Sequence, residues 1–335
     1  MNVVLCALFM LSGVIGAGFA SGRELVRFFA GHGAASGAAA LCALGVLYAL
    51  FLRLPAQLER AHADTLPALC RSRFGRAFGA LCAALFALLA AVTGGAMLAA
   101  CAELCALVLP LRHAYGIGMG ATLALAALLA ALGVRGLALP GALLCAALPV
   151  LMAQLLALPT GEACFWPAMS PDLPVRAAAD GAAYGALNAA MLCGAMPVLL
   201  GLSPRERRRS ALLFTALFGA LLLLGVAVCR RHLQAVWHQP MPFVWLCRGL
   251  GAGGYLLCAA SLYAAALSTL CAMLASLAQP LPRPAGTLAA AGACLFFARV
   301  GFTRLVASFY PLLGALCAAL MLLLCLPIPA QQPRA

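Results

Sequence analysis

Lysine is absent from this 335-residue sequence, and acidic side chains are scarce, with only 8 aspartate and glutamate residues in total. Charged residues make up 9% of the chain, whereas a soluble domain carries about 25%. Most of the acids and the 5 histidines lie between apolar segments. No Ser/His/acid set is recognisable among them, so we expect no enzymatic activity and no catalytic residues.

A Cys-x-x-Cys motif is also missing, although the chain has 16 cysteines. Cys101 and Cys105 form only a Cys-x-x-x-Cys pair, and the others are scattered through apolar runs. Cysteines in such positions usually behave as small buried apolar residues. We therefore expect no metal centre and no cofactor, apart from the bound sodium ion considered below.

What the sequence does contain is apolar residues, which make up 66% of the chain and give a mean hydropathy of +1.07. This composition indicates a polytopic membrane protein whose main surroundings are a lipid bilayer. The net charge of +13 comes from 21 arginines. In a soluble chain it would suggest nucleic acid, but these arginines mostly flank apolar segments, where they determine topology and contact headgroups. We expect no nucleic-acid partner.

Ten segments are apolar enough over about 20 residues to be transmembrane helices. Their bounds are 3–29, 36–54, 76–100, 116–133, 137–158, 177–202, 210–228, 249–277, 286–300 and 305–326. The apolar character after residue 100 continues to Leu109, which predicts a short outer helix there. Residues 230–248 are amphipathic and predict a helix lying at the membrane interface. The first segment resembles a signal peptide but lacks a basic start, so we expect it to be a retained helix.

The first segment is interrupted in a way that suggests a binding site. Glycines at positions 13, 16, 18 and 22 are followed directly by Arg23, Glu24 and Arg27. A broken helix is tolerated in a membrane only where it is enclosed by protein or lines a cavity. Close packing through small residues is the alternative, but the charges directly after the glycines favour a broken helix. We expect carbonyls of residues 12–20 to be free and the second half-helix to start at residues 20–22.

The two halves of the chain, residues 1–158 and 177–327, show corresponding features. The first segment of each half is interrupted, at residues 13–22 and 188–197, and the last segment of each carries a proline, Pro149 or Pro311. Because each half crosses the membrane an odd number of times, five, the two halves have opposite orientations in the membrane. Paired interruptions of this kind indicate a single transporter domain built from an inverted repeat.

Several stretches also resemble a known family. Ile15-Gly-Ala-Gly-Phe-Ala-Ser-Gly-Arg-Glu24, followed by Phe28-Phe29, resembles the opening of the YkvI-like bacterial membrane proteins, which belong to the amino acid–polyamine–organocation superfamily. Further stretches fit in order: Thr93-Gly-Gly-Ala-Met97 to Glu103, Tyr184-Gly-Ala-Leu-Asn188 with Met196-Pro-Val-Leu199, Leu267-Ser-Thr269, and Phe309-Tyr-Pro-Leu-Leu-Gly314. The resemblance implies the all-α LeuT-like fold, with ten transmembrane helices in a 5+5 inverted repeat, helices 1 and 6 broken, in the bacterial cytoplasmic membrane.

The candidate substrate-binding residues lie in and opposite the two interruptions. They are Gly16, Ala17, Gly18, Ser21, Gly22, Thr93, Tyr184 and Asn188. Ser21 is placed to cap the second half-helix, and Tyr184 and Asn188 lie one turn apart on the same face. Other readings remain open: Asn188 as an interhelical hydrogen bond, and Thr93 as a hydroxyl bonded to its own helix.

The resemblance also implies a sodium site. Its ligands would be the carbonyls of Ser12, Ile15 and Ala265 and the hydroxyls of Ser268 and Thr269. The alternative is that both hydroxyls bond to their own helix. Glu24 either pairs with Arg27 at i, i+3, the reading we favour, or titrates as a proton-coupling residue.

These features predict a secondary transporter of a small organic solute, expected to be amino-acid-like, coupled to a sodium or proton gradient. A non-transporting membrane sensor or assembly subunit on a transporter scaffold is the alternative. No oligomeric state is predicted.

The arginine clusters at residues 53–76 and 205–209 predict that both termini are cytoplasmic, because cytoplasmic loops carry the excess of arginine. A reporter fused after Pro204 should therefore report the cytoplasm, and one within residues 160–176 the exterior. A fusion after Pro204 that reports as external would reverse the predicted orientation.

Overall fold

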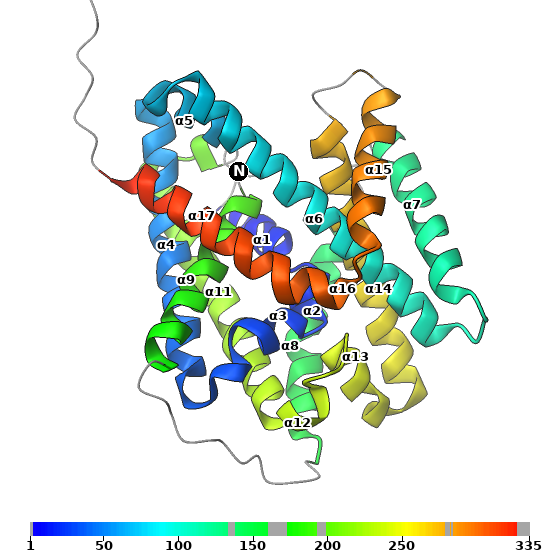
Figure 1. Ribbon diagram of the computed structural model, residues 1–335. Helices are drawn as coiled ribbons and strands as arrows, with labels where there is room; N and C mark the ends of the chain where they lie inside the picture. Colours follow the sequence, from blue (N-terminus) through cyan, green and yellow to red (C-terminus); the bar gives the residue numbers. More distant parts are fainter. Residues whose placement is uncertain are drawn as a thin grey trace, which may run out of the picture.

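The computed structural model describes residues 3–132, 138–159, 173–192, 199–278, 282 and 284–326. These residues contain helices and connections and no β-strand, as expected for an all-helical chain (Figure 1). In chain order the elements are α1 (Val3–Val14), α2 (Ala17–Ala20), α3 (Arg23–Phe28), η1 (Ala30–Ala35), α4 (Ser36–Arg60), α5 (Leu66–Phe74), α6 (Arg76–Val108), α7 (Ala114–Leu132), α8 (Ala138–Ala157), α9 (Leu173–Met191), α11 (Pro204–Arg231), α12 (Leu233–Val236), α13 (Pro242–Leu246), η4 (Cys247–Leu250), α14 (Gly251–Ala278), α15 (Ala285–Ala298), α16 (Phe302–Arg304), η5 (Leu305–Phe309) and α17 (Tyr310–Cys325).

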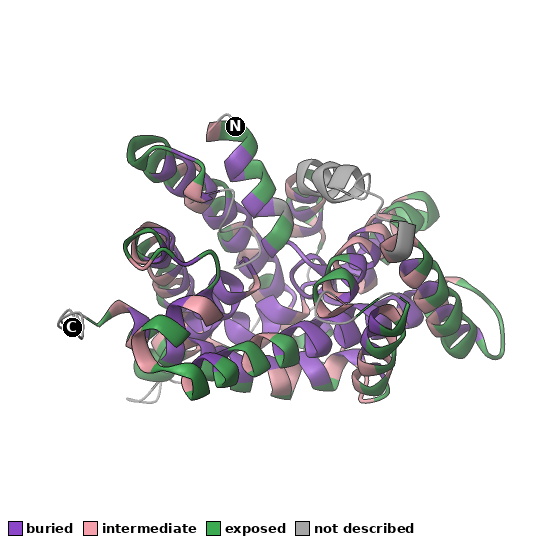
Figure 2. Ribbon diagram, turned by 90° about the horizontal axis from the view of Figure 1, so that it is seen from above, coloured by how far each residue is buried: buried purple, intermediate pink, exposed green. Residues whose placement is uncertain are grey.

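Five helical stretches are long and apolar enough to cross a membrane, judged by length and composition: Ala30–Arg60, Arg76–Val108, Pro204–Arg231, Pro242–Ala278 and Phe302–Cys325. Buried residues fill the centre of the molecule and exposed ones lie on outward-facing surfaces (Figure 2). Many of these exposed side chains are large and apolar, including Leu81, Leu288 and Leu322, each at least 65% exposed. Apolar patches of this extent indicate contact with a hydrophobic environment. The prediction of a helical membrane protein is confirmed.

The first helix is broken, over a shorter stretch than the sequence suggested. α1 continues through Ser12 to Val14, and Gly16 is extended, with φ −93° and ψ −177°. The Gly16 N–H donates to the Val14 carbonyl at 2.9 Å instead of reaching back four residues. The helix resumes at Ala17, earlier than the expected residues 20–22, and is interrupted again at Gly22, whose φ of +82° favours glycine.

A short helix far along the sequence, α13, packs directly on this second interruption. The Phe243 N–H, in α13, donates to the Ser21 carbonyl at 2.8 Å. The region 230–248 was predicted as one amphipathic helix, which is wrong: it forms the short helices α12 and α13. Their apolar side chains, such as Val236 and Phe243, are buried in the protein, so packing against the first helix replaced the expected interface helix.

Two other boundaries differ from the expectation. No separate outer helix follows residue 100, because α6 continues without interruption to Val108. In the second half, α9 extends through Asn188 to Met191. Gly194 and Pro197, which the sequence marks as the break in this segment, lie outside the described residues.

Small residues bring α9 very close to α4. A Cβ atom added to Gly181 would lie 2.2 Å from the Ala39 carbonyl oxygen, and one added to Gly185 would lie 2.6 Å from that of Ala43. Such spacing of small residues lets helix backbones approach in membranes. The close approach fixes the rotation of α9, which in turn aims Tyr184, one residue before Gly185, at the first helix.

This packing predicts that Gly181→Ala and Gly185→Ala destabilise the protein. The added methyl groups would meet backbone, which cannot move aside, at a cost of roughly 1–3 kcal/mol each. Gly45→Ala on α4 is the matched control, since nothing lies within 4 Å of its Cβ position and alanine is the better helix former. The thermal unfolding temperature of the purified protein measures all three. Equal stability of all three variants would contradict the close approach of α4 and α9.

Candidate functional site

The break in the first helix is enclosed by two long helices. A Cβ atom added to Gly16 would lie 3.8 Å from the Met97 sulfur in α6 and 4.0 Å from the Thr269 hydroxyl oxygen in α14. α2 contacts both helices. The unwound backbone is thus covered by protein, as it must be if the segment lies at membrane depth.

Glu24 is the central side chain of this region. It is 6% exposed and extends from α3 back over α2. Its carboxylate occupies the space beside Gly18, where a Cβ atom would lie 1.8 Å from Oε1. The Tyr184 hydroxyl of α9 donates a hydrogen bond of 3.0 Å to the Glu24 carboxylate oxygen Oε2. Gly18, Glu24 and Tyr184 therefore form one packed unit across the two halves of the chain.

The expected pair between Glu24 and Arg27 is wrong. Arg27 turns away and binds Asp180 of α9, with its Nη1 3.4 Å from Oδ2, while His32 Nε2 lies 3.1 Å from the same oxygen. Arg27 Nε also donates to the Ala307 carbonyl at 3.1 Å. That carbonyl belongs to η5, one turn of π-helix, a feature that is frequent at functional sites. Sequence spacing suggested the i, i+3 partner and missed Asp180, which is distant along the chain.

Two hydroxyl groups near Glu24 are buried without a partner. Thr93 and Tyr310 are 0% and 1% exposed, and their hydroxyl oxygens make no hydrogen bond within the described part of the chain. η5, which directly precedes Tyr310, contacts both α3, which carries Glu24, and α6, which carries Thr93. Thr93 thus does not bond to its own helix, the alternative open at the sequence level. Tyr310 was missed as a site residue, although Pro311 beside it marked the interrupted last segment.

Two predicted site residues, Asn188 and Ser21, form hydrogen bonds with the backbone of their own segments. The Asn188 side chain donates to the Tyr184 carbonyl, one turn earlier, at 2.9 Å. The Ser21 hydroxyl donates to the Gly18 carbonyl at 3.1 Å and accepts from the Arg23 N–H at 3.3 Å. Ser21 therefore holds α2 and α3 together, but the N-cap of α3 is Gly22 and not Ser21 as expected. Arg23 itself donates to the Trp237 carbonyl at 2.7 Å.

The predicted sodium ligands belong to α14, to α1 and to the break that follows α1. α14 contacts α2 directly after the break, and the Thr269 hydroxyl oxygen lies 4.0 Å from the position of a Cβ atom on Gly16. The Ser268 and Thr269 hydroxyls donate to the Ala265 carbonyl at 2.9 and 3.1 Å. Both hydroxyls therefore bond to their own helix, which points their oxygen lone pairs away from Ala265. Within the described residues no group of three His, Cys, Asp or Glu side chains could hold a metal ion.

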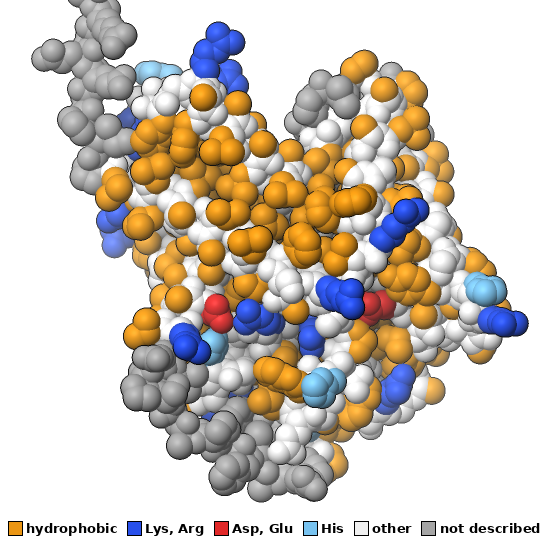
Figure 3. All heavy atoms as spheres, viewed as in Figure 1, with side chains coloured by type: hydrophobic (Ala, Val, Ile, Leu, Met, Phe, Trp, Pro, Cys, Tyr) orange, Lys and Arg blue, Asp and Glu red, His pale blue; other side chains and the backbone are white. Residues whose placement is uncertain are grey.

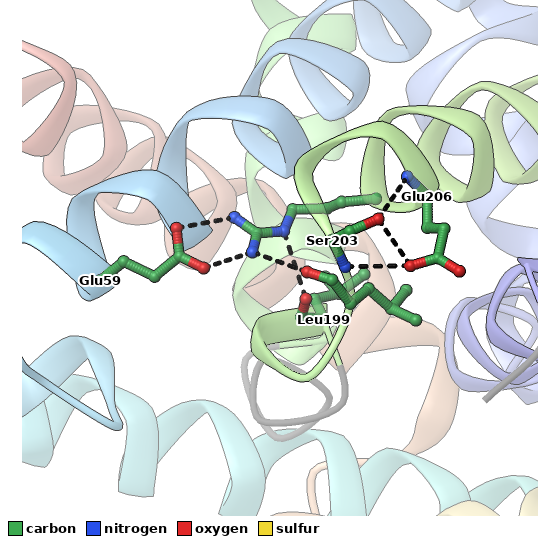
Figure 4. A network of polar contacts seen from close by, with 6 residues as sticks. Glu59, Leu199, Ser203 and Glu206 are labelled. Atoms are coloured by element: carbon green, nitrogen blue, oxygen red, sulfur yellow. Dashed lines mark hydrogen bonds and ion pairs between the residues drawn. The ribbon is translucent and has the colours of Figure 1, made fainter.

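A second polar network lies away from the break. Arg207 of α11 is buried, and it donates to both carboxylate oxygens of Glu59, at the end of α4, and to the Leu199 carbonyl at 3.2 Å. Ser203 and Glu206 form a capping box that starts α11 beside it. Figure 4 shows Glu59 and Leu199 bonded to the guanidinium, with the Ser203–Glu206 capping box beside them. This network joins α4 to the segment between α9 and α11.

The surface carries its charges in limited regions. On the face in Figure 3, hydrophobic side chains cover a broad area, and charged side chains gather beside α5 at one end and along a line below the centre. A broad apolar area between charged regions suits a chain that crosses a bilayer.

The comparisons with known proteins identify no relative. No protein-family model matches the chain, and no curated protein matches its sequence. The functional argument therefore depends on the site itself.

The Gly18–Glu24 contact can be tested by a double-mutant cycle. Gly18→Ala should destabilise the protein by roughly 2 kcal/mol, because the methyl group displaces the carboxylate from its hydrogen bond. In a Glu24→Ala background the space is empty, and the same change should cost less than half as much.

Gly16→Ala is the matched control, since its Cβ position has only ordinary contacts at 3.8–4.0 Å. Thermal unfolding of the purified variants measures the cycle. Additive effects of the two substitutions would show that Gly18 and Glu24 do not pack together.

Proposed function

We propose that this chain is a secondary active transporter of a small organic solute, amino-acid-like and coupled to a sodium or proton gradient. The observation that carries the proposal is the broken first helix, which is enclosed by α6 and α14 and adjoins Glu24, Thr93 and Tyr310. Unwound backbone inside a helical membrane protein is the usual means of binding solutes and ions at the midplane. Buried hydroxyls without a partner favour a polar ligand, since each costs free energy while it is empty.

Helix packing supports the ten-helix inverted repeat of the LeuT-like fold. In the proposed repeat, α1 corresponds to α9, α4 to α11, α6 to α14, α7 to α15, and α8 to α17. The contact between α4 and α9 then corresponds to that between α11 and α1, and both are present. Three further sets of corresponding contacts are also present: α6–α15 with α14–α7, α9–α17 with α1–α8, and α6–α7 with α14–α15. Four pairs of corresponding contacts are what two related halves would produce.

The repeat extends the five long apolar stretches to ten spans by adding the broken or shorter helices α1–α3, α7, α8, α9 and α15. With an N-terminus in the cytoplasm, the arginine clusters at residues 53–76 and 205–209 both lie on the cytoplasmic side. The resemblance to YkvI-like proteins agrees with this architecture and with the bacterial cytoplasmic membrane.

Sodium coupling is proposed for the meeting of α1, α2 and α14. The backbone leaves the helical path at Ile15, and Thr269 faces the next residue. Because the Ser268 and Thr269 hydrogens are donated to Ala265, the two oxygens can act as acceptors toward a cation in the break. Proton coupling through Glu24 is the alternative, supported by a buried carboxylate that contacts both halves of the chain.

Purified protein reconstituted in liposomes tests transport and coupling together. Uptake of a labelled amino-acid panel should exceed that of protein-free liposomes, should fall when choline replaces sodium at fixed pH, and should fall at least tenfold in Ser268→Ala with Thr269→Ala. Ser261→Ala on the same helix is the matched control. Uptake that is independent of sodium but varies steeply with pH would favour Glu24, and binding without uptake would favour a sensor.

A further inference from the structure

The Glu24 carboxylate has no cationic partner among the described residues. Its one hydrogen bond there comes from the Tyr184 hydroxyl. The two arginines of its own helix are engaged elsewhere, Arg27 with Asp180 and Arg23 with the Trp237 carbonyl. A carboxylate removed from water is costly unless a proton or a cation neutralises it. Glu24 is therefore a site for one positive charge.

Thr93 and Tyr310 add two acceptors to this site. Both hydroxyls are buried and make no hydrogen bond of standard geometry in the described part of the chain, and η5, which directly precedes Tyr310, contacts both α3, which carries Glu24, and α6, which carries Thr93. A buried hydroxyl without a partner costs about 1–3 kcal/mol. The arrangement combines an unpaired carboxylate with two unfilled hydroxyls, which is the complement of a ligand that carries positive charge and several N–H donors.

We propose that Glu24, Thr93 and Tyr310 bind the ammonium group of a primary amine. This deepens the transport function proposed above and depends on it. An ammonium group has three N–H donors and no acceptor, and Glu24, Thr93 and Tyr310 offer it three acceptors, while the Tyr184 hydroxyl donates its hydrogen to the Glu24 carboxylate. Calcium takes six to eight oxygen ligands and magnesium requires an octahedral set, and an anion would meet the carboxylate without a compensating cation.

Binding at Glu24 also links the amine to proton movement. In the empty site a proton neutralises the carboxylate. When R–NH₃⁺ enters, that proton leaves to water and the carboxylate pairs with the ammonium, so the net charge of the site is unchanged. Amine and proton therefore compete, and the apparent affinity for the amine rises with pH by up to tenfold per pH unit, until the empty site no longer holds a proton.

The experiment uses the full chain in nanodiscs, with methyl- to butylammonium as probes. Tetramethylammonium, which has the charge but no N–H donor, is the control ligand. The primary amines should raise the unfolding temperature and release protons into a weakly buffered, dye-containing solution, and tetramethylammonium should do neither. The proposal is overturned if tetramethylammonium raises the unfolding temperature as much as the primary amines do, or if no primary amine raises the unfolding temperature.

Variants test each acceptor. Glu24→Gln should lose both the affinity and the proton release, and Thr93→Val and Tyr310→Phe, which keep the shape of the side chains, should each weaken binding about tenfold or more. Asp64→Asn, an exposed acid in a connection, should behave as wild type. An unchanged response in Glu24→Gln overturns the amine site. If liposome uptake of amino acids persists in that variant, the transport proposal stands without it.

Discussion

The constraint on which this structure depends is that backbone released from a helix inside a membrane protein must be enclosed. At Gly16 the chain leaves the helical hydrogen-bond pattern, since the Gly16 N–H reaches only the Val14 carbonyl, and lipid offers no replacement for the lost bonding. α6 and α14 close over the break through Met97 and Thr269. Every other feature of the site follows from this enclosure, because a sealed break is also a place from which water is largely excluded.

Glycine and alanine make the enclosure possible. Gly18 leaves room for the Glu24 carboxylate, and Gly181 and Gly185 let α9 approach the backbone of α4. Tyr184 then reaches across to Glu24. The high content of small residues is thus a packing requirement: larger side chains would separate the helices and move Tyr184 away from the carboxylate.

Arginine has two different uses in this chain. Some arginines, such as Arg205 and Arg208, are exposed, but Arg27 and Arg207 form contacts between distant segments, with Asp180 and Glu59 respectively. Arg27 joins α3 to α9, and Arg207 joins α11 to the end of α4. Both ion pairs therefore connect helices that lie far apart along the chain.

The sequence by itself determined the helical membrane class and the interruption of the first helix, because both follow from local properties: apolar length, the scarcity of charge and glycine spacing. It also singled out Gly18, Glu24 and Tyr184, which pack together in the structure.

Only the tertiary structure decided the partners. Arg27 was assigned to Glu24 by helical spacing, yet it binds Asp180, more than 150 positions away, and Tyr310 was not recognised at all. Partner choice depends on how α9 and the last helix pack against the first, and sequence spacing carries no information about contacts between helices so far apart along the chain.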